Sequence, residues 1–433
     1  MLCRLRSMLT KWVPLLRGEV CGGMKVVVQK FGGSSLATSA MRSEALQRVV
    51  ETAEAGLFPV VVVSAIGRAG DPYATDTLLD LVYEANPGAK GANVDLLLSC
   101  GEIISASIFA EGLQKLGLPA VALTGWQCGI TTDDVHLGAR VTGVQSEKLF
   151  ELLGAGKIPV VAGFQGVTET GKVTTLGRGG SDTTAAVLGV VLKAERVEIF
   201  TDVDGIKTAD PRLIPDAPTL KVMSYREVVE MGHMGAKVLH PRAAEITMEE
   251  GIPLQIRSVV HSKGGTTVGR GFKPKTAFGA EEITDRVVTG IAHLGKRAQV
   301  RIEGASDFHS SGVGTKVFQI LAEAGVSVDL IYLSPDLIAF VIDQAKVSMA
   351  HSVLTPLGLN VKIRAGFAKV SVVGAGMHGV PGVMARVVNC LEGEGISIYQ
   401  TTDSHANISC LVLEEHVSRA VHALYREFQL DRI

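Results

Sequence analysis

The chain of 433 residues exceeds one ordinary domain, so we expect two or three domains that each bury their own core. Its net charge of -2, with 42 Lys and Arg against 44 Asp and Glu, gives no reason to expect a nucleic acid or a lipid surface as partner. No apolar run approaches the roughly 20 residues that cross a bilayer, which argues against a membrane segment.

The six cysteines are scattered and form no CxxC pair, so the sequence predicts neither a disulfide framework nor a zinc site. A reducing cytoplasm is the expected location. Residues 1–23 carry four basic residues, but Trp12 and Pro14 interrupt the apolar stretch. We interpret this segment as an extension or a misassigned start before Met24, in preference to a signal peptide.

From Lys25 onward, short apolar runs alternate with amphipathic helical stretches, and each run ends in small or polar residues. This alternation predicts an α/β fold with a mostly parallel sheet covered on both faces, whose ligands bind at the carboxyl ends of the strands. The expected strands are Val26–Gln29, Val60–Val63, Ala120–Leu123, Val160–Ala162, Val197–Phe200 and Leu254–Ile256, with helices such as Glu102–Leu116 and Thr183–Lys193 between them.

After about residue 265, a Gly, Lys and Pro-rich stretch resembles a linker, and an internal repeat follows it. A shift of 70 positions aligns Val300–Gly304 with Val370–Gly374, and Gly312 with Gly382. Each copy reads strand, loop, helix, strand, strand, helix. We therefore expect two small antiparallel sheets with helices on one face, and a ligand pocket where the copies meet.

The segment Lys30–Ser35 (KFGGSS) lies where the first strand ends. Backbone N–H groups beside the two glycines could approach phosphate oxygens while Lys30 supplies a positive charge. An ordinary glycine turn with a solvated lysine is the alternative. The segment does not match the GxxxxGK[ST] loop, so Walker-type binding is excluded.

A second glycine-rich loop, Leu176–Thr184 (LGRGGSDTT), precedes an expected helix. Ser181, Asp182 or Thr183 could serve as the N-cap of that helix. Capping does not explain Arg178 inside the glycine run, where a guanidinium offers a bidentate grip on a carboxylate or phosphate. We therefore favour a binding role for this loop.

Two further groups of acidic residues are candidates for the site. Thr201–Gly205 and Thr208–Arg212 follow a buried strand, and metal binding, nucleotide contact and a polar turn all stay open for them, with Asp202 the best functional candidate. Glu102 follows Gly101 among apolar residues, so it needs a partner if it is buried. It could cap its helix or hold a substrate ammonium group.

The stretch Gly374–Gly379 fits the pattern GxGxxG, which is typical of dinucleotide-binding loops. Only about 55 residues follow it, too few for a nucleotide fold. We interpret it as a tight loop of the second repeat.

Five motifs in this order resemble aspartate kinases, and the resemblance runs from about Met24 to the C-terminus. They are Lys30–Ser35 (KFGGSS), Ser99–Glu102 (SCGE), Thr174–Asp182 (TTLGRGGSD), Thr201–Gly205 (TDVDG) and Gly235–Arg242 (GAKVLHPR). The resemblance implies an amino acid kinase fold at 24–265, a linker at 266–288, and two ACT domains at 289–365 and 366–433. It also implies transfer of the γ-phosphoryl group of ATP to L-aspartate, the first step toward lysine, diaminopimelate, threonine and methionine.

The resemblance also implies roles for individual residues. Catalysis falls to Lys30, Arg178 and Asp182. Substrate binding falls to Ser34, Ser64, Thr75, Glu102, Arg178 and Ser181. Nucleotide binding falls to Lys30, Gly32, Gly33, Ser35, Thr201, Asp202, Lys207, Arg212 and Lys237. No metal site of the protein itself is implied, since Mg²⁺ is carried by ATP.

Two departures from the family pattern are visible. Lys207 stands where the family often has an aromatic residue, and Gly70–Tyr73 forms a small insertion before Thr75. The chain is most similar to stand-alone bacterial forms inhibited by diaminopimelate, although lysine or threonine stays open as the effector. A homodimer or larger homo-oligomer through the ACT domains is expected. The rival interpretations are a kinase for glutamate or N-acetylglutamate, and a catalytically silent amino-acid sensor.

Overall fold

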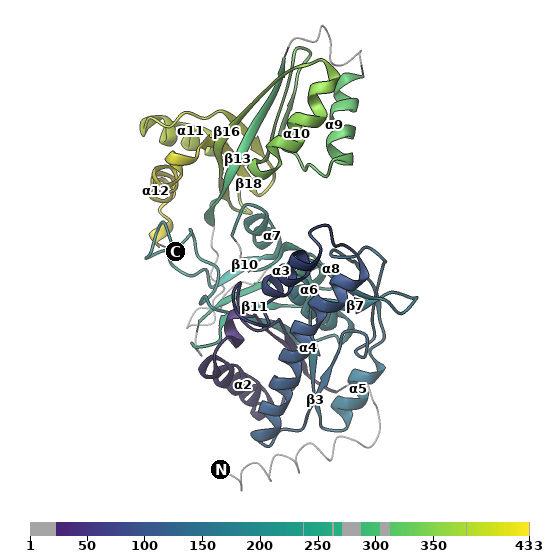
Figure 1. Cartoon of the computed structure of the whole chain (residues 1–433). Coiled ribbons are helices and arrows are strands. Elements are labelled where there is room, and N and C mark those ends of the chain that lie inside the picture. Colours follow the sequence, from purple (N-terminus) through teal and green to yellow (C-terminus); the bar gives the residue numbers. More distant parts are fainter. Residues whose placement is uncertain are drawn as a thin grey trace. The chain divides into compact units, whose positions relative to one another are not determined.

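The computed structural model describes residues 23–236, 238–261, 264–270, 287–303, 312–377 and 379–432. Lys237 and residues 1–22 of the predicted extension lie outside the described residues. The chain divides into two compact units, of which the first contains most of residues up to 282 and the second contains the rest together with residues 207–218 and 230–236. Figure 1 shows the helices and strands of both units.

The first unit is built on an eight-stranded sheet in the order β10-β12-β11-β9-β1-β2-β6-β3. All neighbouring strands are parallel except β11 and β12. The six predicted strands are confirmed, and their continuous apolar runs fit burial on both faces. The strands are β1 (Val26–Phe31), β2 (Phe58–Val63), β3 (Ala120–Leu123), β6 (Ile158–Ala162), β9 (Arg196–Thr201), β10 (Val222–Ser224), β11 (Leu254–Ser258) and β12 (Thr266–Gly269).

Helices cover both faces of this sheet. On one face, α2 (Ser39–Glu54) and α4 (Ala92–Lys115) bury Val49, Phe109 and Leu113 against Phe31 and Phe200 of the strands. On the other face, α6 (Gly180–Val191) packs against β1, β2 and β9, with α8 (Pro241–Glu250) beside it. The first unit also contains α3 (Thr75–Ala85) and α5 (Glu147–Gly154), and α7 (Tyr225–His233) belongs in part to each unit.

Helix α4 is long and apolar enough to cross a membrane by length and composition alone. Half of its most apolar window is buried in the unit, and Asp95 and Glu102 lie inside the protein on the same helix. Its apolar residues are therefore accounted for by packing in the core.

A second, four-stranded sheet in the order β5-β4-β7-β8 was not expected from the sequence. Its strands have only three or four residues, too few to give a clear alternating pattern. They are β4 (Ile130–Thr132), β5 (Val141–Val144), β7 (Gln165–Val167) and β8 (Val173–Thr175). This sheet brings the loop at residues 133–140 beside the glycine-rich loop that follows β8, where the Ala139 N–H donates to the Thr175 carbonyl at 2.9 Å.

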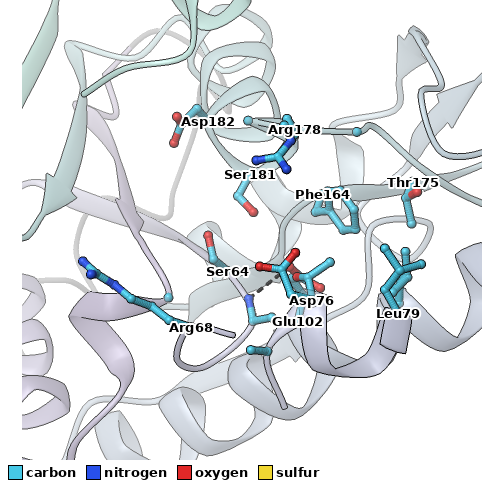
Figure 2. Close-up of a pocket in the computed structure, with 18 of the residues that line it drawn as sticks. Ser64, Arg68, Asp76, Leu79, Glu102, Phe164, Thr175, Arg178, Ser181 and Asp182 are labelled. Atoms are coloured by element: carbon cyan, nitrogen blue, oxygen red, sulfur yellow. Dashed lines mark hydrogen bonds between the residues drawn. The ribbon is translucent and has the colours of Figure 1, made fainter. Parts of the chain in front are cut away.

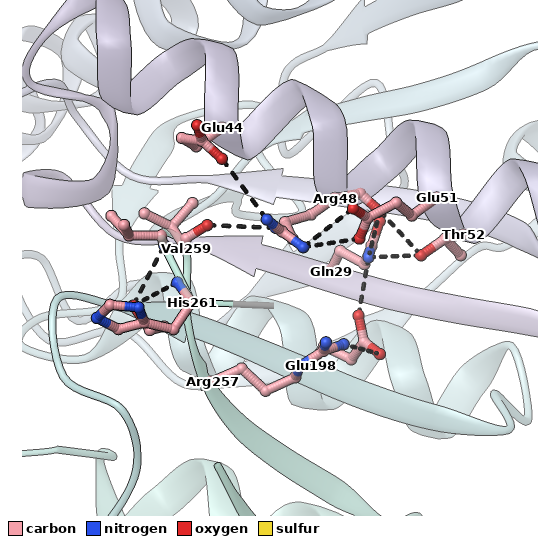
Figure 3. A network of polar contacts seen from close by, with 11 residues as sticks. Gln29, Glu44, Arg48, Glu51, Thr52, Glu198, Arg257, Val259 and His261 are labelled. Atoms are coloured by element: carbon pink, nitrogen blue, oxygen red, sulfur yellow. Dashed lines mark hydrogen bonds and ion pairs between the residues drawn. The ribbon is translucent and has the colours of Figure 1, made fainter. Parts of the chain in front are cut away.

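A buried polar network fastens helix α2 to the strand that carries Lys30 (Figure 3). The Gln29 amide donates to the Thr52 hydroxyl and to the Glu198 carboxylate, both at 2.8 Å. Arg48 donates to the Val259 carbonyl at 3.2 Å, which joins α2 to the end of β11. Because Gln29 and Glu198 have no exposed surface, these partners are needed to offset the cost of burying them.

The second unit contains one six-stranded antiparallel sheet in the order β14-β15-β13-β16-β18-β17. Both repeat copies have the predicted order of strand, helix, strand, strand, helix. The first comprises β13 (Gly290–Glu303), α9 (Val313–Glu323), β14 (Asp329–Leu333), β15 (Leu337–Asp343) and α10 (Val347–Leu354). The second comprises β16 (Asn360–Val373), α11 (Val383–Gly393), β17 (Gln400–Asp403), β18 (Asn407–Leu413) and α12 (Val417–Glu427).

The two copies exchange strand segments. The first part of β13 pairs with the end of β16, and its residue Ile291 packs in the core of the second copy. The first part of β16 packs Val361 and Ile363 against the core of the first copy. The modules are therefore interleaved along the chain, so a contiguous boundary at residue 365 or 366 does not describe how their cores are built.

The second unit also includes two segments from within the predicted catalytic domain. Ala209, Ile214 and Ala217 join the core of the second copy, and the Asn407 amide donates to Glu230 at 2.5 Å. Conversely, Thr266–Gly269 lies in the predicted linker but forms a strand of the first unit's sheet.

Candidate active site

A pocket of about 460 Å³ opens at the carboxyl ends of the strands in the first unit. One wall comes from the loops after β1 and β2 and from helices α3 and α4. The other comes from the loop between β8 and α6 (Figure 2). This is the edge at which a parallel sheet of this type is expected to bind its ligand.

The loop after β1 is shaped by Gly33. A Cβ atom at this position would lie 2.5 Å from the Ala65 carbonyl oxygen and 2.6 Å from that of Gly67. The Gly67 N–H donates to the Gly33 carbonyl at 3.0 Å, so the loops after β1 and β2 are in direct backbone contact. Only glycine allows this approach, which sets Lys30 at the pocket wall.

The loop between β8 and α6 depends on Gly177 and Gly179, which have φ values of 73° and 71°. A Cβ atom at Gly179 would lie 2.2 Å from the His240 ring. Gly179 is the N-cap of α6 and no side chain caps the helix. The alternative that Ser181, Asp182 or Thr183 serves as the N-cap is therefore wrong. Instead, Ser181 and Asp182 lie in the first turn and line the pocket.

Lys30 and Asp182, which both line the pocket, form an ion pair, with Lys30 Nζ 2.6 Å from Asp182 Oδ1. Both side chains are only 12% exposed, so solvent weakens their attraction less than on a surface. The Lys30 charge is thereby held at the end of β1, next to the first turn of α6, where a phosphate group would also be favoured by the helix dipole.

Glu102 lies on α4 with 2% of its surface exposed. One carboxylate oxygen accepts the Ala65 N–H at 3.0 Å, while the other, Oε2, has no hydrogen-bond partner. Burial raises the pKa of Glu102 to about 8, although the Ala65 N–H and the Lys30 charge partly oppose the shift. A buried carboxylate with a free oxygen at a pocket wall is suited to receive a cationic group.

This pKa gives a testable pH dependence. Below about pH 8 the Glu102 carboxyl of the empty pocket is mostly protonated, so an ammonium group that pairs with it must displace a proton. The KM for an amino-acid substrate is therefore expected to fall as the pH rises from 6.5 toward 8 and to level off above that. Initial rates across this range for the wild type and Glu102→Gln would check it. The variant should have a higher KM that no longer falls with pH. If the KM of the variant still fell with pH as in the wild type, the titrating group would be a residue other than Glu102.

Eight predicted site residues line the pocket: Lys30, Gly33, Ser64, Thr75, Glu102, Arg178, Ser181 and Asp182. Gly32, Ser34 and Ser35 lie in the loop after β1 but outside the lining, and Ser35 has no exposed surface. Thr201 and Asp202 follow β9, the strand next to β1, and the Thr201 hydroxyl donates to Asp202 at 3.0 Å.

Of the other predicted nucleotide contacts, two belong to the second unit and one is not described. Lys207 and Arg212 belong to the second compact unit, and the Arg212 guanidinium pairs with Asp210 at 2.6 Å. This contact raises the pKa of Arg212 and lowers that of Asp210. Lys237 lies outside the described residues.

Sequence reasoning missed several lining residues, among them Arg68, Leu137, Phe164 and Thr175. Arg68 lies in the loop after β2, two residues before the small insertion at Gly70–Tyr73, and it forms an ion pair with Asp202. Because β1 lies between β2 and β9 in the sheet, this pair joins the loops on either side of the Lys30 strand. A basic residue in the small, polar loop that follows the predicted strand Val60–Val63 was the signal that could have identified Arg68.

Comparisons with known proteins agree with this architecture. Residues 25–258 match the amino acid kinase family and residues 362–426 match an ACT domain. Aspartokinase 1 of Bacillus subtilis (strain 168) is 42% identical over 409 residues, which cover 94% of this chain and all of the relative. An aspartokinase of Geobacillus stearothermophilus is 39% identical over 413 residues, which cover 94% of this chain and 98% of the relative.

Among solved structures, E. coli aspartokinase III in complex with aspartate and ADP aligns with a TM-score of 0.77 and 26% identity. The alignment covers 93% of this chain and 99% of that one. The sheet, the two glycine loops and the paired small modules define an amino acid kinase with an ACT tail. Within that class, the chain belongs to the aspartokinase family. The predicted fold class and family are confirmed.

Proposed function

We propose that the pocket around Lys30 and Asp182 is where this chain transfers the γ-phosphoryl group of ATP to the side-chain carboxylate of L-aspartate. The prediction that the chain is an aspartate kinase is confirmed by its membership of the aspartokinase family. The products are ADP and 4-phospho-L-aspartate. The observation that supports this pocket as the site is the short Lys30–Asp182 ion pair beside Arg178 and the unpartnered oxygen of Glu102.

The side chains divide into two anchoring groups for aspartate. Arg178 offers a bidentate contact to the α-carboxylate, and the Glu102 carboxylate pairs with the α-ammonium group. Ser64, Thr75 and Ser181 supply hydroxyl groups at the same pocket, and Ser34 is proposed to assist from the neighbouring loop. Held this way, the β-carboxylate faces Lys30.

The chemistry requires no strong general base, because the attacking β-carboxylate is already ionised at pH 7. Catalysis then consists of alignment and charge neutralisation. Lys30 offsets negative charge on the transferring phosphoryl group, and Asp182 orients the Lys30 ammonium through their ion pair.

The nucleotide is proposed to bind beside the loops after β1 and β9. Gly32, Gly33 and Ser35 are proposed to shape the loop at which the phosphates lie, and the Gly32 N–H itself donates to the Phe200 carbonyl at 3.3 Å. Thr201 and Asp202 lie at the end of the adjacent strand. Roles for Lys207, Arg212 and Lys237 in nucleotide binding remain proposals from the family resemblance.

Mg²⁺ is proposed to arrive with ATP. Among the described residues, no group of three or more His, Cys, Asp and Glu side chains is placed to hold a metal ion. The carboxylates of Asp182 and Asp202 are hard oxygen ligands of the kind that Mg²⁺ prefers, and both lie at the proposed phosphate side. The ion would supply further charge neutralisation at the phosphates.

The tail is proposed to bind a regulatory amino acid. E. coli aspartokinase III has been solved in complex with lysine and aspartate, and it aligns with this chain at a TM-score of 0.71 and 26% identity. For this chain the effector is proposed to be diaminopimelate, lysine or threonine, bound by the ACT modules, with an allosteric coupling of about 1–3 kcal/mol. We further propose a homodimer or larger homo-oligomer through the ACT modules and a cytoplasmic location.

The proposal is tested by an ATP-dependent hydroxamate assay of the full chain with aspartate, glutamate and N-acetylglutamate. Turnover is expected with aspartate alone, because the motifs that match are those of aspartokinases. Each reaction is repeated with lysine, threonine and diaminopimelate, and the amino acid that inhibits identifies the effector. Turnover with glutamate or N-acetylglutamate instead would replace the proposed substrate, and no turnover on any substrate would favour a silent sensor.

A further inference from the structure

We propose that Asp95 is a positioning residue for the aspartate side of the pocket. Its carboxylate fixes Leu137 and Thr175 and, through them, the loop that carries Arg178. This inference rests on the proposed function, because it uses the substrate-binding roles assigned to Arg178 and Glu102. Neither Asp95 nor the loop at residues 133–140 was a candidate from the sequence.

Asp95 lies in the first turn of α4 with no exposed surface. Its Oδ1 accepts the Thr175 hydroxyl at 2.5 Å and the Leu137 N–H at 3.1 Å, while its Oδ2 lies 2.6 Å from Nδ1 of His136. A buried carboxylate is costly unless several donors satisfy it. Here the donors come from two separate segments, so the carboxylate joins them.

The Leu137 backbone needs this support. Its φ of 64° places a branched, non-glycine residue in the left-handed region, which such residues rarely adopt. The Leu137 N–H donates to the Asp95 carboxylate, and Leu137 is one of the residues that line the pocket. Removing the acceptor would therefore release a strained segment of the pocket wall.

The position of Leu137 constrains the turn that precedes Arg178. A Cβ atom at Gly177 would lie 3.1 Å from the Leu137 carbonyl oxygen, so the two turns pack directly against each other. The Thr175 hydroxyl bound to Asp95 is two residues before Gly177. The Asp95 carboxylate therefore holds both the end of β8, through Thr175, and the turn next to Arg178, through Leu137.

Helix α4 also carries Glu102, seven residues after Asp95 and therefore about two turns along the same face. The helix carries Glu102, the proposed partner of the substrate ammonium group. Through Asp95 it also positions the loop of Arg178, the proposed partner of the α-carboxylate. The spacing between Glu102 and Arg178 is therefore set by one rigid element. A change at Asp95 should disturb aspartate binding far more than nucleotide binding, because Thr201 and Asp202 follow a different strand.

The first test compares Asp95→Asn with the wild type and with the control Asp133→Asn. Asp133 lies in the same loop and accepts the Arg140 N–H at 2.9 Å, but it is not part of the pocket lining. Asp95→Asn is expected to raise the KM for aspartate about tenfold or more, because a buried charged acceptor with several donors is weakened. The KM for ATP should stay within about twofold of the wild type, and the control should resemble the wild type for both substrates.

A second pair of variants keeps the test decisive if Asp95→Asn fails to fold. In His136→Asn the amide nitrogen can occupy the place of Nδ1 and still donate to Asp95, whereas His136→Leu removes the donor. His136→Asn should retain a near-normal KM for aspartate, and His136→Leu should raise it without an equal rise in the KM for ATP. Thermal unfolding of each variant separates this effect from a general loss of stability.

Equal rises in both KM values, or a lowered unfolding temperature with an unchanged KM for aspartate, would overturn the positioning role. A wild-type chain without aspartate-dependent ATP turnover would instead overturn the proposed function. The two failures are therefore distinguishable in the same set of assays.

Discussion

Lys30→Ala is expected to lower kcat by a factor of about 10²–10³ or more, because one preorganised positive charge at the transferring phosphoryl group is removed. The change also leaves the Asp182 carboxylate without the ammonium that lies 2.6 Å away, which adds a negative charge beside the phosphates. Steady-state kinetics with saturating aspartate and ATP measure the effect. The KM values should change less than kcat, since the interaction is strongest in the transition state.

Lys25→Ala is the matched control for this variant. Lys25 precedes the same strand, but its side chain is 67% exposed and its partner Glu195 is 3.8 Å away at the surface. Exposed pairs of this kind contribute little, so the control should retain wild-type kcat. Near-normal turnover of Lys30→Ala would show that the assignment of Lys30 is wrong.

Arg178→Ala is expected to raise the KM for aspartate by about 10- to 100-fold and to lower kcat as well, because a bidentate contact to the α-carboxylate is lost. Arg178→Lys should fall between the wild type and the alanine variant, since a lysine keeps the charge but not the fork geometry. The KM for ATP is the internal reference in the same assays.

Arg140→Ala provides the control for Arg178, because Arg140 is an exposed residue of the neighbouring loop outside the pocket lining. It should leave both KM values unchanged. If Arg178→Ala raised the KM for ATP and left that for aspartate unchanged, Arg178 would belong to the phosphate side of the site.

Much of the site could be predicted because its parts are local in sequence. Gly33 and Gly179 occur in short motifs at strand ends, and the structure shows why only glycine fits there. The N-cap alternative for Ser181 to Thr183 was wrong because Gly179 takes the cap position with a left-handed backbone, a choice that the composition of the loop does not reveal.

Other parts could not be predicted because their partners are distant. Gln29 and Glu198 stand in apolar strands, and only the packing of α2 on the sheet shows how each is satisfied. Arg68 lies in the loop after β2, and its position beside Asp202 depends on the strand order. Asp95 precedes the helix that the sequence predicted at Glu102–Leu116, and only the structure extends that helix to Ala92 and places the loop at residues 133–140 beside Asp95.

The sequence by itself determined the parallel-sheet class, the strand-end glycine loops, the repeat of small modules and the family. These follow from periodicity and short motifs, which are properties of neighbouring residues. Tertiary structure alone decided that Lys30 meets Asp182, that Asp95 holds Leu137, and that β13 and β16 exchange segments between the modules. Each of these contacts joins residues far apart in the chain, so its energy depends on the packing of whole elements and leaves no local pattern.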